Sequence, residues 1–528
     1  MCKVMRKLLC FLALSIGVCA CSGEKVSVDD STPDPASAAE DISHEMIVLG
    51  AQLEDPFSVS NMTKALASLY PTKADRVVLD PTDVYVRFLP SGDEQYTALE
   101  EMGLVLIDHP VDYEILKEGD YYHDPEVPEG DITWQYAVVP VGFEFPESIA
   151  YEVLDDVFIA ENSTTKADCF DWDAVEREAY RITGNEGLLC EATKAGGTAP
   201  SGCIQIRDDA FPDEIYGVKG VRVSCNSFVK FAHAYTDEDG NYAMTRTFTG
   251  NPRYRLVFKN SKGFGIGFNL LLVPASFSTL GKNGPEGVSV VIDSSSERKL
   301  FCRSVVNNAA YDYYESCEGD GDSICTPPAN LRFWLFQGLG SSSAVMLQQG
   351  AWVSGSLLAD FLGEYLPLLE MFLPDITLGL KSAATYADIY SVAVHEMAHA
   401  SHFMQVGTDY WDQYIKFVIT SWVTSGFVTY GAGTEKDRGF CEVGEMWAYY
   451  VQTVMYRERY PDSDKVYGTS YWFSPQIFLN LDERGLDRFK IFEALTSEVT
   501  DRDLLQTKLI SLYTEMKSTI NQAFGRYK

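Results

Sequence analysis

"SVAVHEMAHASHF", residues 391–403, contains the most informative pattern in the chain. It places His395, Glu396 and His399 within five positions of a chain that has only seven histidines. The apolar residues around them predict a helix, and positions i and i+4 of a helix lie on the same face. Two imidazoles can therefore face one ion, with Glu396 beside them. The alternative is an ordinary buried helix, but core helices seldom carry a carboxylate between two histidines.

This arrangement predicts a zinc site. Catalytic zinc is held by three protein ligands and keeps a position for water, whose pKa falls towards about 7. A neighbouring carboxylate can take the proton as the water attacks a carbonyl. We therefore predict one Zn²⁺ ion bound by His395, His399 and a third ligand from elsewhere, with Glu396 as the general base.

The predicted elements before this helix extend the pattern. A strand at 288–294 and a helix at 294–317 are followed by strands at 331–338, 343–349 and 374–380. This order, together with H-E-x-x-H, resembles the zincin metallopeptidases. The resemblance implies a zincin-like α+β catalytic domain over residues 283–528.

Two zincin classes differ in the third ligand. Metzincins need glycine and histidine where this chain has His402 and Gln405, so His402 is expected to support a ligand or lie at the surface. Gluzincins use a glutamate from a later helix, and "FCEVGEMWAYYVQTVMY", residues 440–456, offers Glu442 and Glu445. Glu445 followed by Ala448 resembles the gluzincin E-x-x-A pattern. We predict Glu445 as the ligand and Glu442 as a residue that orients a histidine, although the reverse assignment stays open.

An oxyanion at this site would need a hydrogen-bond donor. Four tyrosines are candidates that the sequence cannot rank: Tyr449, Tyr450, Tyr467 and Tyr471.

The N-terminus is typical of an exported protein. Residues 1–21 combine a basic start, a short apolar stretch and small residues. Val18 to Cys21 resembles a bacterial lipobox, which implies lipidation of Cys21 and anchoring to the bacterial outer membrane or cell surface. Residues 22–43 are polar and predict a flexible tether. We expect membrane association through this anchor only.

Charge and cysteine content restrict the remaining possibilities. A net charge of -34 and a pI near 4.5 argue against nucleic-acid binding. The cysteines beyond Cys21 permit disulfides in an exported chain, and we predict Cys203–Cys225 and Cys317–Cys325 pairs. The spacing C-x-x-C is absent after Cys21, which argues against a cysteine-based zinc site.

The predicted fold is multidomain α+β. Residues 44–165 form an α+β domain with a β-α-β unit at 83–90, 92–103 and 104–111, and 166–194 connect it to the next domain. Residues 195–282 alternate as strands and resemble the carboxypeptidase regulatory-like domain, a transthyretin-like antiparallel β-sandwich. The residues that carry this match are Gly202, Ile204, Ile206, Asp208, Gly220, Val221, Val223, Thr236, Asp237, Gly240 and Tyr242.

The resemblance to gluzincins implies a zinc-dependent endopeptidase that hydrolyses proteins or glycoproteins at the bacterial cell surface. The rival expectation is a binding lipoprotein that keeps the zincin fold, cuts nothing and captures a host or dietary ligand.

Overall fold

The computed structural model describes residues 46–527, apart from 75–76, 120, 129–130, 164–169, 191–196, 269–275, 320–322, 339, 352–374 and 425–429. The predicted signal peptide, Cys21 and the tether lie outside the described residues. Within those that are described, no helix combines the length and apolarity needed to cross a membrane.

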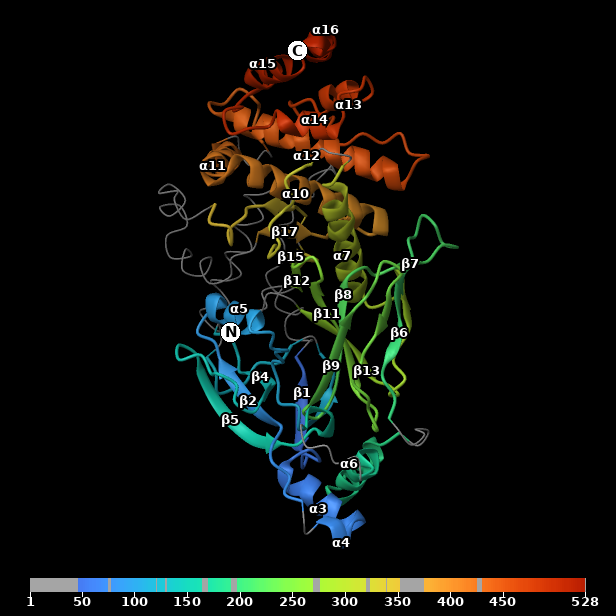
Figure 1. The fold of residues 1–528 in the computed structure, drawn as a ribbon. Coiled ribbons are helices and arrows are strands. Elements are labelled where there is room, and N and C mark those ends of the chain that lie inside the picture. The colour runs from blue at the N-terminus through green and yellow to red at the C-terminus, as the bar shows by residue number, and fades with distance from the viewer. Residues whose placement is uncertain are drawn as a thin grey trace.

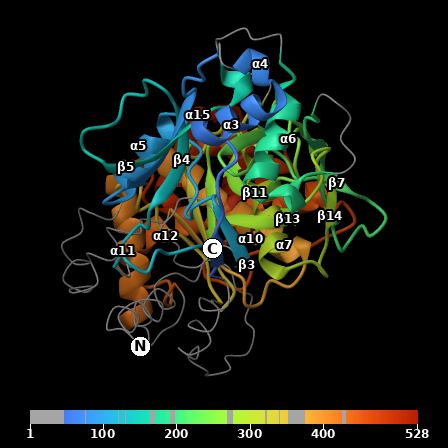
Figure 2. The same cartoon turned by 90° about the horizontal axis from the view of Figure 1, so that it is seen from below.

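The chain forms a multidomain α+β structure in which the N-terminal strands and the central strands lie side by side and the C-terminal helices lie at one end of the molecule (Figure 1). A mixed α/β region lies nearest the N-terminus, β-sheets occupy the centre, and helices form the C-terminal end. Seen from below, the N-terminal strands β4 and β5 and the central strands β13 and β14 lie on opposite sides of the molecule (Figure 2).

The N-terminal region contains a three-stranded antiparallel sheet in the order β4-β2-β5 and a two-stranded ribbon of β1 and β3. Its elements are β1 (Val48–Gln52), α3 (Val59–Leu69), α4 (Pro71–Ala74), β2 (Asp83–Leu89), α5 (Asp93–Glu101), β3 (Tyr113–Lys117), β4 (Gln135–Pro140), β5 (Ala150–Val157), η1 (Ala160–Asn162), α6 (Trp172–Ile182) and η2 (Glu186–Leu188).

The predicted β-α-β unit is wrong in its last strand. Both β2 and α5 form as expected, but 104–111 is irregular and makes only an isolated bridge between Ile107 and Tyr136. Pro110 has no backbone N–H to donate to a neighbouring strand. The side chain of Asp108 accepts a hydrogen bond from the backbone N–H of Tyr122 at 2.5 Å. The neighbours of β2 are therefore antiparallel strands from later in the chain.

Two sheets form the centre of the molecule. One has the path β10-β6-β14 with β7 beside β6, and the other has the path β16-β17-β15-β12-β11-β8-β9 with β13 beside β11. The central strands are β6 (Ser201–Ile206), β7 (Tyr216–Gly217), β8 (Val221–Ser227), β9 (Lys230–Tyr235), β10 (Asn241–Ala243), β11 (Arg253–Asn260), β12 (Gly265–Phe268), β13 (Phe277–Lys282) and β14 (Val290–Ile292).

The larger sheet continues across the predicted boundary at 282. Strand β12 pairs in parallel with β15, and β15 pairs in parallel with β17. One hydrophobic core runs from Ile204 on β6 to the C-terminal helices. The predicted sandwich and catalytic regions thus share a sheet and a core, and the domain limits themselves stay predictions.

The predicted disulfides do not form. Cys203 and Cys225 are free thiols in separate sheets, with Cys203 Sγ 3.5 Å from the carbonyl oxygen of Asp239 and Cys225 Sγ 3.5 Å from Met244 Sδ. Cys317 and Cys325 are also free thiols. Strand alternation predicted that Cys203 and Cys225 lie on strands of one sandwich. In the structure the two strands belong to different sheets, and each thiol has a different neighbour.

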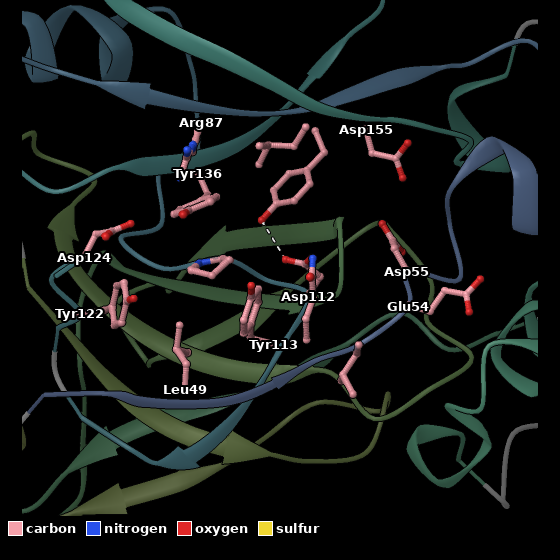
Figure 3. Close-up of a pocket in the computed structure, with 15 residues that line it drawn as sticks. Leu49, Glu54, Asp55, Arg87, Asp112, Tyr113, Tyr122, Asp124, Tyr136 and Asp155 are labelled. Carbon is pink, nitrogen blue, oxygen red and sulfur yellow. Dashed lines mark hydrogen bonds between the residues drawn. The ribbon is translucent and has the colours of Figure 1, made fainter. Parts of the chain in front are cut away.

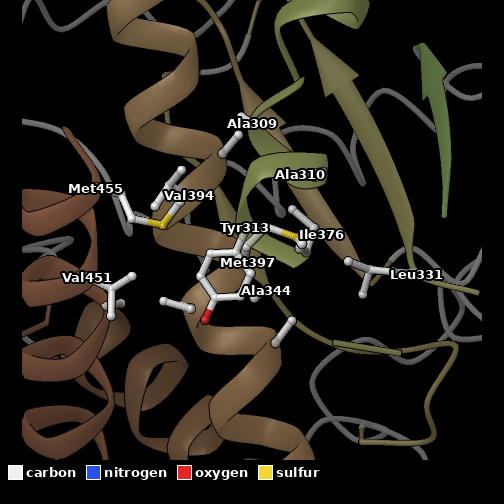
Figure 4. Close-up of a cluster of buried hydrophobic side chains, with 14 of the residues drawn as sticks. Ala309, Ala310, Tyr313, Leu331, Ala344, Ile376, Val394, Met397, Val451 and Met455 are labelled. Atoms are coloured by element: carbon white, nitrogen blue, oxygen red, sulfur yellow. The ribbon is translucent and has the colours of Figure 1, made fainter. Parts of the chain in front are cut away.

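The C-terminal region follows the predicted order of helix, strands and helix. Its elements are α7 (Arg298–Ser316), β15 (Arg332–Phe336), β16 (Ser343–Ala344), β17 (Ile376–Gly379), α10 (Tyr386–Val406), α11 (Thr408–Thr424), α12 (Arg438–Arg459), α13 (Gln476–Asp482), α14 (Arg488–Glu493), α15 (Arg502–Leu512), η4 (Thr514–Met516) and α16 (Lys517–Arg526). Tyr313 of α7, Met397 of α10 and Val451 of α12 meet in one buried cluster (Figure 4). This packing holds α10 between α7 and α12.

Candidate metal centre

Helix α10 carries the H-E-x-x-H residues and is defined at both ends. Thr385 and Asp388 form a capping box, in which the N–H of Asp388 donates to Thr385 Oγ1 at 3.2 Å and the N–H of Thr385 to Asp388 Oδ2 at 3.1 Å. Gly407 ends the helix with φ of 80°, a conformation that favours glycine. His395 and Glu396 therefore lie in the helix interior, where their spacing is fixed.

Helix α12 packs directly against α10. Trp447 Nε1 donates to the carbonyl oxygen of Ala398 at 3.1 Å, which ties the two helices together beside the histidines. Ala448 is fully buried, as a small residue at a close helix contact should be. The contact brings Glu445 of α12 to the histidine face of α10.

The structure gathers His395, His399 and Glu445 into one group. One ligand atom from each lies within 4.8 Å of the others, and all three side chains are fully buried. Glu445 Oε2 lies 3.5 Å from His395 Nε2, and Glu445 Oε1 lies 3.5 Å from His399 Nε2. Of the two candidate glutamates, Glu445 is the one beside the histidines.

Two further side chains orient this group, and sequence reasoning missed both. Gln452 Oε1 lies 3.1 Å from His395 Nδ1 and can accept its N–H, which leaves the lone pair of Nε2, on the side of Glu445, available to a metal ion. The Tyr414 hydroxyl donates to Glu445 Oε1 at 2.6 Å. Gln452 lies seven positions after Glu445, on the same helix face, so helical spacing could have identified it; Tyr414 comes from α11 and carries no such signal.

The electrostatics of the group favour metal ligation. Burial lowers the pKa of His395, which keeps the imidazole neutral and able to bind a cation. Burial acts to raise the pKa of Glu445, but His399 and His395 beside it hold that pKa below its ordinary value. Neutral imidazole and ionised carboxylate are the protonation states that zinc requires.

Glu396 is buried beside the group. Burial and the charge of Glu445 raise its pKa well above the ordinary value, and neither carboxylate oxygen has a hydrogen-bond partner in the described part of the chain. An isolated buried carboxyl is costly unless something compensates it. A cation held by the neighbouring ligands would compensate it and would favour the ionised form.

The residues present therefore fit a zinc ion. Two imidazole nitrogens and a carboxylate oxygen are the donors of gluzincin-type zinc sites, and among described residues no other group of histidine, cysteine, aspartate and glutamate meets the same spacing. The buried oxygens of Glu396 supply a second, independent sign that a charged group belongs here.

Glu442 and His402 have other surroundings than expected. Glu442 pairs with Arg502 of α15, at 3.6 Å between Oε1 and the guanidinium, and the histidine-orienting contact is made by Gln452 instead. His402 is fully buried against Tyr410 and Trp411, so the surface alternative is wrong.

The structure separates the four tyrosine candidates. The ring of Tyr449 lies against His395, with 4.3 Å between ring centroids. Tyr471 packs behind it at 5.7 Å from the Tyr449 ring. The hydroxyl of Tyr450 donates to Asp482 at 2.8 Å, and Tyr467 packs against Tyr456. Tyr449 is the candidate in contact with the group of His395, His399 and Glu445.

Comparison with known proteins identifies no relative: no family model matches the chain, and neither the curated proteins nor the solved structures contain a match.

Proposed function

We propose that the protein is a zinc-dependent peptidase of gluzincin type, exported and lipid-anchored at a bacterial surface. The observation that carries the proposal is the buried convergence of His395, His399 and Glu445, with ligand atoms within 4.8 Å of one another, next to Glu396. Bound zinc would supply an activated water and a Lewis acid for a peptide carbonyl.

Each residue then has a defined task. His395, His399 and Glu445 hold the ion, while Gln452 and Tyr414 fix the orientation of two of those ligands. Glu396, one position after His395, takes a proton from water and later donates it to the leaving amine. The Tyr449 ring limits the motion of His395 by packing on it.

A second candidate function is the non-catalytic binding protein with the same fold. One observation favours it: Glu396 and all three proposed ligands expose nothing to solvent. A substrate carbonyl must reach Glu396 for hydrolysis, whereas a purely structural metal site needs no access.

Turnover of a mixed peptide library by the zinc-loaded full chain separates the two candidates. The peptidase proposal expects cleavage that a chelator abolishes and that Glu396→Gln reduces by several orders of magnitude while zinc stays bound. Equal cleavage by wild type and Glu396→Gln would refute the mechanism, and absence of cleavage by zinc-loaded wild type would favour the binding protein.

A further inference from the structure

A second site lies in the N-terminal region, far along the chain from the metal-binding group. A pocket of about 640 Å³ opens between the β1-β3 ribbon and the β4-β2-β5 sheet (Figure 3). This volume is within the range of small-ligand sites in proteins. The pocket has no part in the function proposed above, so its lining needs an explanation of its own.

The lining is strongly acidic. Five carboxylates surround the pocket, namely Glu54, Asp55, Asp112, Asp124 and Asp155. The single cation in the lining, Arg87, does not offset them, because its guanidinium pairs with Glu152 at 2.6 Å and stacks over the ring of Trp134 at 4.1 Å. The pocket therefore holds an uncompensated negative charge.

Asp55 is a lining carboxyl with one buried oxygen that has no hydrogen-bond partner among the described residues. Its Oδ1 accepts from the N–H of Phe57 at 2.9 Å, but its Oδ2 is buried and has no hydrogen-bond partner among the residues described. Burial raises the pKa of Asp55 to about 8, and the charges of Asp112 and Asp155 act in the same direction, so Asp55 is mostly protonated near pH 7. A ligand that brings positive charge would lower this pKa and favour the ionised carboxylate.

Aromatic rings complete the pocket. Tyr85, Tyr113, Tyr122 and Tyr136 line it, and the labelled rings of Tyr113, Tyr122 and Tyr136 surround the space in Figure 3. Aromatic faces attract organic cations, most strongly where water is excluded. Carboxylates and rings in one concave site thus favour the same kind of ligand.

The spacing of the carboxylates argues against a bare metal ion. Among the described residues, only His395, His399 and Glu445 bring three candidate ligand atoms within 4.8 Å of one another. The pocket carboxylates are spread more widely than the ligand shell of one ion, and they match a larger cation that carries its charge on an organic stem.

We propose that this pocket binds an alkylammonium group, carried either by a free diamine or by the lysine side chain of a peptide. The carboxylates neutralise the ammonium group, and the tyrosine rings cover its methylene stem.

Isothermal titration calorimetry on the full chain tests this proposal with three probes: 1,5-diaminopentane, a peptide with one central lysine, and 1,5-pentanediol as the neutral match. We expect binding of one or both amines, no binding of the diol, and weaker amine binding as salt increases. Binding of the diamine alone assigns the site to a free amine, and binding of both assigns it to lysine side chains as well.

Variants locate the binding. Asp155→Asn and Glu54→Gln each remove one exposed lining carboxylate without loss of volume, and each should weaken amine binding about 3- to 5-fold, the loss expected for an ion pair at an exposed position. Asp156→Asn is the matched control, because it removes the same charge from the neighbouring, non-lining position of β5 and should change affinity less than about twofold. Equal binding of amine and diol, no binding of either amine, or equal effects of all three variants would overturn the proposal.

Discussion

Replacing Gln452 by leucine tests the contact that orients His395. The change keeps a side chain of similar size but replaces the amide with methyl groups, so it removes the acceptor 3.1 Å from His395 Nδ1. Both residues are almost fully buried, at 0% and 2% exposure, so no solvent replaces the lost acceptor. Two effects should follow, one on stability and one on metal affinity.

The two effects have different sizes. Leaving the Nδ1 N–H without a partner costs about 1–3 kcal/mol of folding stability. Loss of a partner that orients a metal-binding histidine lowers metal affinity by about 10- to 100-fold, or roughly 1.4–2.8 kcal/mol. The His395–Gln452 hydrogen bond is present without metal, so zinc affinity depends only on how much this bond strengthens when zinc binds. We therefore expect zinc affinity to fall about tenfold, the lower end of that range.

Competition with a chromophoric chelator measures the affinity, and urea unfolding measures the stability. Tyr450→Phe is the matched control, because it removes a bond of similar kind on the same helix, the 2.8 Å bond to Asp482, away from the metal-binding group. It should lower stability by about 1 kcal/mol and leave zinc affinity unchanged. Unchanged zinc affinity in folded Gln452→Leu, or an equal loss in Tyr450→Phe, would refute the role given to Gln452.

Three other predictions follow from the same geometry and from the sequence. Tyr414→Phe removes the 2.6 Å bond to Glu445 and should weaken zinc about 3- to 10-fold in the chelator assay, with full affinity in the variant counting against an orienting role. Asp208→Asn should lower the free energy of unfolding by about 3 kcal/mol, because the Asp208 side chain is 1% exposed and bonds Arg459 at 2.9 Å and Tyr460 at 2.7 Å. A change below about 0.5 kcal/mol in urea unfolding would show that these contacts do not hold α12 to the central strands. Cys21→Ser should move the protein from the membrane fraction to the soluble fraction, and a variant that stays lipidated would reject Cys21 as the anchor.

Sequence periodicity predicted the parts of the fold that depend on local pattern. The helix around His395 and the strands at 332–336 and 376–379 form where apolar spacing placed them. The prediction of Glu445 rather than Glu442 came from the resemblance to the gluzincin E-x-x-A pattern, and Ala448 of that pattern is buried where α12 packs against α10. These features are encoded within one or two elements.

The remaining features depend on contacts between distant segments. Tyr414 reaches Glu445 across the α11–α12 interface, and Arg502, which pairs with Glu442, comes from α15. Periodicity cannot identify such partners. Segment 104–111 alternates like a strand but does not form one, because Pro110 has no N–H for strand pairing and Asp108 makes side-chain hydrogen bonds instead.

We expect Glu445, and not Glu442, to complete a zinc site with His395 and His399. The direct measurement is the zinc-to-protein ratio of purified full-length Glu445→Ala and Glu442→Ala beside wild type, with circular dichroism to confirm that each is folded. We expect about one zinc per chain in wild type and Glu442→Ala, and a ratio near zero in Glu445→Ala, because two imidazoles alone bind zinc weakly. His399→Ala provides a second variant with the same expected loss. Full zinc retention by folded Glu445→Ala, or zinc lost from Glu442→Ala instead, would contradict the account.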